Sequence, residues 1–411
     1  MFSFTPKLLS LLTLLVIVCT GCQQGRTKAV TPSFKDDLAF LKTYTDVIAL
    51  GDDENGPRVA VVPQYQGRVM TSTTGGPDAA GFGWINRKLI ASGEIKPHIN
   101  VFGGEDRFWL GPEGGQFSIF FKGGDKFDLE HWQTPAVIDT VPYKVTARSA
   151  REVSFRHETG IANYSGTQFD VRIDRTIRLI DDDNCAKLLG LKSMPNVKAV
   201  AYESDNRLTN RGDQPWTKEA GALSIWILGM FRHSNETTVV IPYRMGPEEK
   251  LGAIVNDAYF GKVPADRLVV ADGVMYFKGD GKYRSKIGVL PQRATGVLGS
   301  YDAAGQVLTI AQYTQPAGVT DYVNSMWELQ EHPFAGDAVN SYNDGPPEPG
   351  KPPLGPFYEL ETSSPAAFLA PGGSIRHVHR TFHFQGDPNE LDKISRAVLG
   401  VSTDQIEHAF D

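Results

Sequence analysis

Most of the sequence consists of short segments of alternating apolar and polar residues, separated by turns rich in glycine. Gln168 to Leu179 is the clearest segment. There Phe169, Val171 and Ile173 alternate with charged residues, which predicts a strand with one buried and one wet face. Ile375 to Phe384 alternates again, and the chain contains no repeat and no alternation of strands with crossover helices. The pattern predicts an all-β fold with minor helix, a large antiparallel sandwich.

Local signals add two hairpins and two terminal helices. Tyr276 to Ile287 and Val297 to Tyr313 each hold a glycine-bearing turn between two strand patterns, which is typical of hairpins. Ser33 can cap a helix that begins at Phe34, and Asp387 to Leu399 predicts a closing amphipathic helix with a proline in its first turn. Strand signals never pause for a linker, so residues 34–411 are expected to form a single domain.

The N-terminus indicates export and a lipid anchor. The apolar stretch Leu8 to Val18 is too short to span a membrane but suits a signal segment. It ends in Cys19-Thr20-Gly21-Cys22, which resembles the bacterial lipobox, in which the last cysteine receives a lipid. This resemblance implies a signal peptide over residues 1–21, lipidation of Cys22 and a tether over residues 22–33. The protein would then be held by its lipid at the bacterial cell envelope, on the outer membrane or the periplasmic face. The alternative is an ordinary cleaved signal with a chance cysteine.

The net charge and the number of cysteines limit the binding partners and the disulfides that can be expected. Removal of the signal takes away Lys7, which leaves 40 basic against 48 acidic residues, a formal charge of −8. That charge argues against nucleic acid as a partner. With Cys19 removed and Cys22 lipidated, Cys185 stands alone, so no disulfide is expected, and we interpret Cys185 as a packing residue.

Polar residues without an evident structural duty gather in a few segments. The densest segment runs from His98 to Gly115, where paired glycines let a ligand approach the backbone. Its side chains offer acid, base, charge and a stacking face. We expect a set of polar residues from several segments to converge on one concave face, namely Arg68, His98, Asn100, Glu105, Asp106, Arg107, Trp109, Glu113, Asn343 and Glu361.

This mixture of side chains suits a carbohydrate. Sugars are bound by dense hydrogen-bonding groups around the hydroxyls and by an aromatic face against the C–H side. The structural alternative is that Arg107 pairs with Glu105 or Asp106 on a surface strand and that Trp109 belongs to the core.

Three segments carry a resemblance to a known superfamily. Leu360-Glu361-Thr362, followed by Pro365-Ala366 and Leu369 to Ser374, is similar to the C-terminal segment of galactose mutarotases. Gly103-Gly104 through Pro112 looks like the glycine-pair strand of the hexose-phosphate epimerase branch, and Gly67-Arg68-Val69 resembles the N-terminal glycine-arginine strand. The sequence as a whole resembles a family of bacterial lipoproteins assigned to this galactose mutarotase-like (aldose 1-epimerase) superfamily. The resemblance implies a β-supersandwich fold.

The resemblance also implies a mechanism. In aldose epimerases a glutamate takes the anomeric proton and a histidine donates one to the ring oxygen. Glu361 matches the glutamate, but Tyr202 to Arg232, the stretch that corresponds to the histidine motif, contains no histidine. His98 could supply the acid from another strand. Three functions remain open: a carbohydrate-active enzyme without a cofactor, a non-catalytic glycan-binding lipoprotein of an uptake or degradation system, and a structural envelope protein.

A row of histidines near the C-terminus raises the question of a metal. His377, His379 and His383 share one face of a predicted strand, and three histidines on one face could bind a transition metal. Histidines on the polar face of a strand are more often solvated, and their spacing alone sets no tetrahedral geometry. We therefore assign no metal site.

Overall fold

The computed structural model describes Met1 and residues 32–411, and residues 32–411 form one compact unit. The expected signal peptide, the lipid-bearing Cys22 and most of the tether lie outside the described residues. Among the helices of the described part, none has the length and apolar character needed to cross a bilayer.

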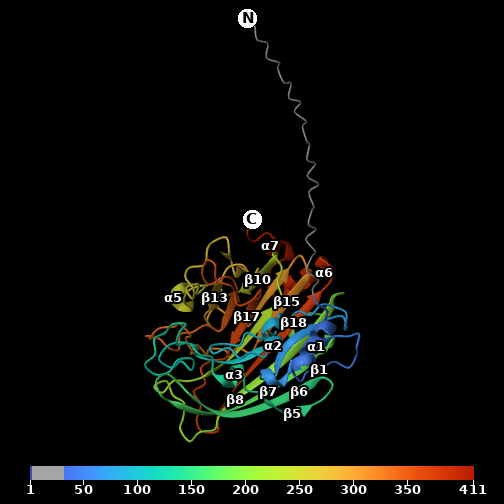
Figure 1. The fold of residues 1–411 in the computed structure, drawn as a ribbon. Coiled ribbons are helices and arrows are strands. Elements are labelled where there is room, and N and C mark those ends of the chain that lie inside the picture. Colours follow the sequence, from blue (N-terminus) through green and yellow to red (C-terminus); the bar gives the residue numbers. More distant parts are fainter. Residues whose placement is uncertain (2–31) are drawn as a thin grey trace. The chain divides into compact units, whose positions relative to one another are not determined.

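Two large antiparallel sheets dominate the unit (Figure 1). The first has ten strands in the order β11-β12-β10-β14-β15-β18-β8-β7-β6-β5. Their bounds are β5 Lys144–Arg148, β6 Glu152–Ala162, β7 Gln168–Ile180, β8 Lys198–Asn210, β10 Thr237–Pro242, β11 Leu268–Ala271, β12 Val274–Lys278, β14 Val297–Asp302, β15 Val307–Tyr313 and β18 Ser374–Gln385. The second has five strands in the order β13-β16-β17-β9-β4. Its strands are β4 Arg107–Gly111, β9 Ser224–Phe231, β13 Ser285–Val289, β16 Val339–Asn343 and β17 Tyr358–Ser363.

The five-stranded sheet packs one face against the ten-stranded sheet. Phe108 and Ile227 from the smaller sheet share a core with Phe155 and Val171 from the larger one. A second core joins strands β13, β16 and β17 to strands β10, β12 and β14. Two facing sheets bury the apolar side of each strand, so the expected antiparallel β-supersandwich is confirmed.

Helices cover parts of the outer surfaces. Helix α1, Phe34–Tyr44, begins at the predicted cap Ser33, and its Asp37 binds Arg87 and Arg232. A small sheet of β1 Ile48–Leu50, β2 Arg58–Val62 and β3 Arg68–Thr73 completes the N-terminal part. The remaining helices are η1 Pro63–Tyr65, α2 Arg87–Ser92, α3 Ala136–Asp139, α4 Asp182–Leu188, α5 Glu248–Leu251, α6 Pro388–Val398 and α7 Thr403–Glu407.

Helices α4, α6 and α7 share a third core with the outer face of the ten-stranded sheet. Cys185 of α4 is buried in this core, and burial raises the pKa of its thiol to about 12, so it acts as a packing residue. Helix α6 matches the predicted closing helix, with Asp387 as its cap.

One of the two predicted hairpins is confirmed and the other is wrong. Strands β14 and β15 pair as an antiparallel hairpin, as expected. Strands β12 and β13 do not pair: β12 pairs with β10 and β11, whereas β13 pairs with β16 in the other sheet. The turn between them crosses from sheet to sheet. Asp280 in that turn is held by Arg267 and by Asn343, contacts that a local pattern of strand and turn cannot contain.

Candidate functional site

The face of the five-stranded sheet that points away from the core forms the floor of a cleft of about 590 Å³. Alternation along the strands creates this face. On β17, Leu360 enters the core, so Glu359 and Glu361 point to the cleft side. On β4, Phe108 enters the core, and Arg107 and Trp109 line the cleft.

Loops from distant parts of the chain build the walls, which are rich in aromatic rings. Trp132 stacks on Trp327 with ring centroids 5.8 Å apart, and it also stacks on Phe120. The aromatic residues that line the cleft are Trp109, Trp132, Trp226, Tyr259, Phe260, Trp327, Tyr342 and Phe357. Such rings offer the C–H side of a sugar several stacking surfaces.

Glu359 is a buried carboxyl group on the floor of the cleft. Its Oε1 accepts a hydrogen bond of 2.8 Å from the guanidinium of Arg107, and the Arg107 guanidinium also lies 4.3 Å from the centre of the Trp109 ring. Burial raises the pKa of Glu359 to about 8, although Arg107 and Lys286 act in the opposite direction. Glu359 therefore holds a proton at neutral pH and is a candidate acid.

Glu361, two residues further along β17, has a different environment. Its Oε2 accepts hydrogen bonds from Lys286 Nζ at 3.0 Å and from Trp226 Nε1 at 2.9 Å. Lys286 thus places a positive charge beside this oxygen. Glu361 is fully buried and does not itself line the cleft, but Lys286 and Trp226 both do. The two glutamates of one strand thus face the same side in contrasting surroundings.

Beside this pair lies a small buried polar region. Asp337 Oδ2 accepts hydrogen bonds from Tyr259 Oη at 2.6 Å and from Asn256 Nδ2 at 3.1 Å, and burial raises the pKa of Asp337. Several buried polar atoms here lack a hydrogen-bond partner within the described residues. They are Arg107 Nε, Trp109 Nε1, Ser224 Oγ, Asp337 Oδ1 and Glu361 Oε1. Unpaired buried polar atoms are costly, and their clustering beneath a cleft is typical of a site built for a polar ligand.

Four of the residues singled out from the sequence line the cleft, namely His98, Arg107, Trp109 and Glu113. His98 is exposed, and its Nδ1 lies 2.6 Å from the carbonyl oxygen of Trp132. Glu113 is partly buried, and burial raises its pKa, with the charge of Glu361 adding to the shift. Trp109 is only 3% exposed, so it packs in the core as well as lining the cleft.

Glu105 and Asp106 do not line the cleft, and Arg107 pairs with neither of them. Asp106 forms a fully buried ion pair with Arg175, because it points to the opposite side of the strand from Arg107. Glu105 accepts hydrogen bonds from the backbone and hydroxyl of Ser72 and from Tyr202 Oη, and lies 3.1 Å from His383. Both carboxylates therefore belong to the buried interior.

Arg68, Asn100 and Asn343 also lie away from the cleft. Arg68 donates to the carbonyl of Gly103, and burial lowers its pKa to about 9. Asn100 donates to Asp139 at 2.7 Å. Asn343 holds the turn between β12 and β13 through the N–H of Gly281. Each residue satisfies groups that folding would otherwise leave buried and unpaired.

The three C-terminal histidines are buried, not solvated. His377 Nε2 and His379 Nδ1 each lie 2.9 Å from Thr362 Oγ1, and His383 Nδ1 lies 2.9 Å from Thr309 Oγ1. Burial lowers the pKa of His377 to about 3 and that of His379 to about 4. These two rings are neutral partners of hydroxyl groups between the sheets. In the described part of the chain, no cluster of three or more His, Cys, Asp or Glu side chains is arranged to hold a metal ion.

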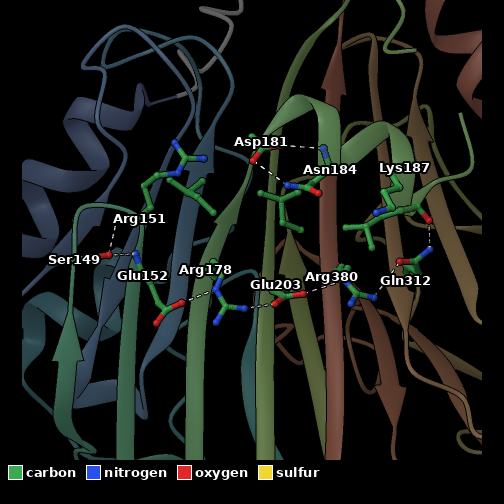
Figure 2. Close-up of a pocket in the computed structure, with 13 residues that line it drawn as sticks. Ser149, Arg151, Glu152, Arg178, Asp181, Asn184, Lys187, Glu203, Gln312 and Arg380 are labelled. Atoms are coloured by element: carbon green, nitrogen blue, oxygen red, sulfur yellow. Dashed lines mark hydrogen bonds and ion pairs between the residues drawn. The ribbon is translucent and has the colours of Figure 1, made fainter. Parts of the chain in front are cut away.

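A larger hollow of about 980 Å³ lies on the outer face of the ten-stranded sheet (Figure 2). Figure 2 shows its charged side chains paired in a row across the strands, in the order Glu152, Arg178, Glu203, Arg380 and Gln312. Oppositely charged neighbours across strands stabilise a sheet, so we interpret this row as a structural ladder. The aromatic cleft, which gathers carboxyl groups in contrasting environments, is the candidate site.

The site residues expected from the sequence did not include Lys286, Trp226 or Glu359. Trp226 stands in an apolar run that reads as core, and Lys286 stands in the segment taken for a hairpin. The sequence did contain a signal for Glu359. Glu359 and Glu361 lie on either side of the buried Leu360, so in a strand both glutamates must point to the same face. No comparable local signal pointed to Lys286.

Comparisons with known proteins agree with this fold. The model of a family described as "Family of unknown function (DUF6786)" matches residues 32–410. No curated protein matches the sequence. Among solved structures, the Slr1438 protein from Synechocystis sp. PCC 6803 superposes with a TM-score of 0.50 at 13% identity, over 84% of this chain and 98% of that one.

Two further structures align over 82% of this chain. One is described as a putative aldose 1-epimerase from Escherichia coli K12, with a TM-score of 0.48, 12% identity and 99% of that chain covered. The other is described as a galactose mutarotase-like protein from Lactobacillus casei ATCC 334, with a TM-score of 0.47, 10% identity and 100% of that chain covered. At 13% identity the similarity to the Slr1438 protein concerns the fold alone.

Proposed function

This chain belongs to the family of unknown function DUF6786, and we propose that its cleft binds a sugar and opens the sugar ring by acid–base catalysis. The observation that supports the proposal is the pair of glutamates on β17. Glu359 bonds to Arg107 and is protonated near neutral pH, whereas Glu361 accepts hydrogen bonds from Lys286 and Trp226. Two carboxyl groups in contrasting environments are the usual basis for separate acid and base roles.

The proposed reaction needs no group beyond these side chains. Glu361 lies beneath Lys286 and Trp226, and when these two side chains move aside its carboxylate takes the proton of the anomeric hydroxyl. Glu359, which lines the cleft, donates its proton to the ring oxygen. The bond between the anomeric carbon and the ring oxygen breaks, and an open-chain aldehyde forms. Closure on the other face of the carbonyl, with both proton transfers reversed, inverts the anomeric carbon and restores the two glutamates. We assign Oε1 of Glu361 as the accepting atom, because Oε2 is already engaged by two donors.

The competing proposal is a glycan-binding protein without catalysis. It is supported by the aromatic walls and by Arg107, which together would bind a sugar even without proton transfer. Glu359 lines the cleft and Glu361 lies on the same face of β17, and this pairing of two carboxyl groups favours the catalytic proposal.

The test follows freshly dissolved single anomers of common aldoses by NMR or polarimetry, with and without the purified protein. Glu359→Gln and Glu361→Gln keep the shape of each side chain and are expected to lower the catalysed rate about 10²- to 10⁴-fold. Glu328→Gln is the matched control, because Glu328 lines the cleft but is exposed.

Three other outcomes decide against parts of the proposal. Loss of activity in Glu113→Gln but not in Glu361→Gln would move the base to Glu113. Thermal stabilisation by a sugar without any rate enhancement would favour the binding protein. If the protein neither binds a sugar nor speeds anomer interconversion, a structural role is the remaining function.

For location, we propose a lipid anchor at Cys22 on the bacterial cell envelope. The proposal rests on the apolar segment and on Cys19-Thr20-Gly21-Cys22 that follows it. The cleft would then act outside the cytoplasm on a sugar or glycan.

A further inference from the structure

The mouth of the cleft carries large apolar side chains in contact with water. Leu129, Phe260 and Leu354 are 59%, 45% and 50% exposed, and all three line the cleft. They come from three separate loops, which precede α3, follow α5 and follow β16. We call these three residues the apolar rim. Single exposed apolar residues are normal on a protein surface, but three that meet at one opening mark a binding surface.

The rim is a packed part of the structure. The guanidinium of Arg284 lies 3.9 Å from the centre of the Phe260 ring, and the edge of that ring meets Tyr342 at a centroid distance of 6.0 Å. These contacts hold the exposed ring at the mouth. Further in, the stacked Trp132 and Trp327 continue the apolar surface toward the floor.

The floor has the opposite character. It carries the hydrogen bond from Arg107 to Glu359 and the ion pair Lys286–Glu361, in which every side chain is at most 10% exposed. A polar group of a ligand fits this end, whereas an apolar group fits the rim. The cleft volume of about 590 Å³ falls within the range of roughly 300–1,000 Å³ that holds ligands larger than a single sugar ring.

We infer that the ligand is an amphiphilic aldose, with its sugar ring on the charged floor and an apolar substituent against the rim. The inference rests on the proposed function and narrows its substrate class. The reaction at the floor requires a free anomeric hydroxyl, so the apolar group must be attached elsewhere on the sugar, for example as an ester of the primary hydroxyl.

The test is a series of hexoses esterified at the primary hydroxyl with acetyl, butanoyl and octanoyl chains. Dissociation constants are measured by calorimetry below the concentration at which the esters form micelles. Each methylene that reaches the rim is expected to tighten binding about fourfold. The octanoyl ester should therefore bind about tenfold or more tightly than the acetyl ester, with a matching fall in KM for anomer interconversion.

The control is a variant of the protein that lacks apolar side chains of the rim. A variant with Leu129→Ser and Leu354→Ser, which leaves the aromatic rings of the cleft in place, should lose most of the dependence on chain length and keep its affinity for the unsubstituted hexose. Thermal unfolding checks that this variant is folded. Leu329→Ser is the matched control, because Leu329 is 69% exposed and adjoins Glu328 but does not line the cleft.

Two results would overturn the inference, and they are distinguishable. If unsubstituted hexoses bind and the acyl chain adds nothing to the affinity, or its gain survives in the variant with Leu129→Ser and Leu354→Ser, the amphiphilic ligand is wrong and the sugar cleft stands. If no hexose binds, esterified or not, the proposed function fails and this inference fails with it.

Discussion

Lys286 Nζ lies 3.0 Å from Glu361 Oε2, and the two side chains are 10% and 0% exposed. The residues are 75 positions apart in the sequence and come from β13 and β17, which flank β16 in the sheet. The ion pair therefore passes over the intervening strand. It places a positive charge beneath the cleft next to the carboxyl group that the proposed reaction uses as its base.

Lys286→Met is expected to destabilise the protein strongly, because it leaves the Glu361 charge buried without its cation. Loss of one partner of a buried ion pair costs about 3–5 kcal/mol of unfolding free energy. Urea unfolding measures the change. The double variant Lys286→Met with Glu361→Gln should recover part of the loss. Lys282→Met, at an exposed lysine in the turn before β13, should change little. If Lys286→Met alone lowers the unfolding free energy by less than about 1 kcal/mol, the Lys286–Glu361 ion pair does not stabilise the fold as expected.

The buried histidines are expected to make the fold sensitive to acid. The pKa values of His377 and His379 are lowered to about 3 and about 4, below the value of about 6.5 for an unfolded histidine. Their contribution is fully present above about pH 6.5 and is lost as the pH falls toward the folded pKa, because only the unfolded chain then binds the proton.

Between pH 6.5 and pH 5 each of these histidines should cost about 2 kcal/mol of unfolding free energy. His377→Gln should therefore narrow the stability difference between pH 7 and pH 5 in urea unfolding. The same substitution at the exposed His332 should leave that difference unchanged. An unaltered difference in His377→Gln would show that His377 does not carry the effect.

The pKa shift of Glu359 affects stability in the opposite direction with pH, and it can also be tested through activity. Its pKa is raised to about 8 by burial, so the stability it contributes is fully present below about pH 4.5 and is lost as the pH rises through about 8. As the proposed acid it must hold its proton, and the rate of ring opening should fall as the pH rises through about 8. A pH–rate profile measures this. The same fall should appear in Glu328→Gln, and a rate that stays constant to pH 10 would exclude Glu359 as the acid.

Two tryptophans of the cleft should respond differently to replacement by alanine. Trp109 is 3% exposed and packs in the core, so Trp109→Ala is expected to cost about 3–5 kcal/mol of unfolding free energy. Trp327 is partly exposed on the wall of the cleft, so Trp327→Ala should weaken sugar binding by about 1–2 kcal/mol. Denaturant unfolding and calorimetry separate the two effects. Equal losses of unfolding free energy in both variants would contradict the assignment of Trp109 to the core and of Trp327 to the wall of the cleft.

The lipid anchor is tested at Cys22. The wild-type protein should partition into detergent and carry a diacylglycerol mass at its N-terminus, whereas Cys22→Ser should not. N-terminal mass spectrometry after expression in a bacterial host makes the measurement. Release of both forms as soluble protein of equal mass would show that the cysteine is not lipidated.

The sequence by itself determined the features that depend on neighbours along the chain. The alternation in β7 correctly assigned its buried and its solvent-facing side, the cap Ser33 marked the start of α1, and Pro388 marked the first turn of α6. The β14–β15 hairpin was also predictable. In each case a contact within a few residues decides the outcome, so a short pattern carries the information.

The tertiary structure alone decided which polar residues meet. Alternation separates Asp106 from Arg107 but does not say which of the two faces the core. It also cannot say that β12 and β13 part into different sheets, or that Lys286 reaches Glu361 across β16. Pairing between distant strands depends on the simultaneous packing of both sheets, and the charges of the cleft are placed by that packing.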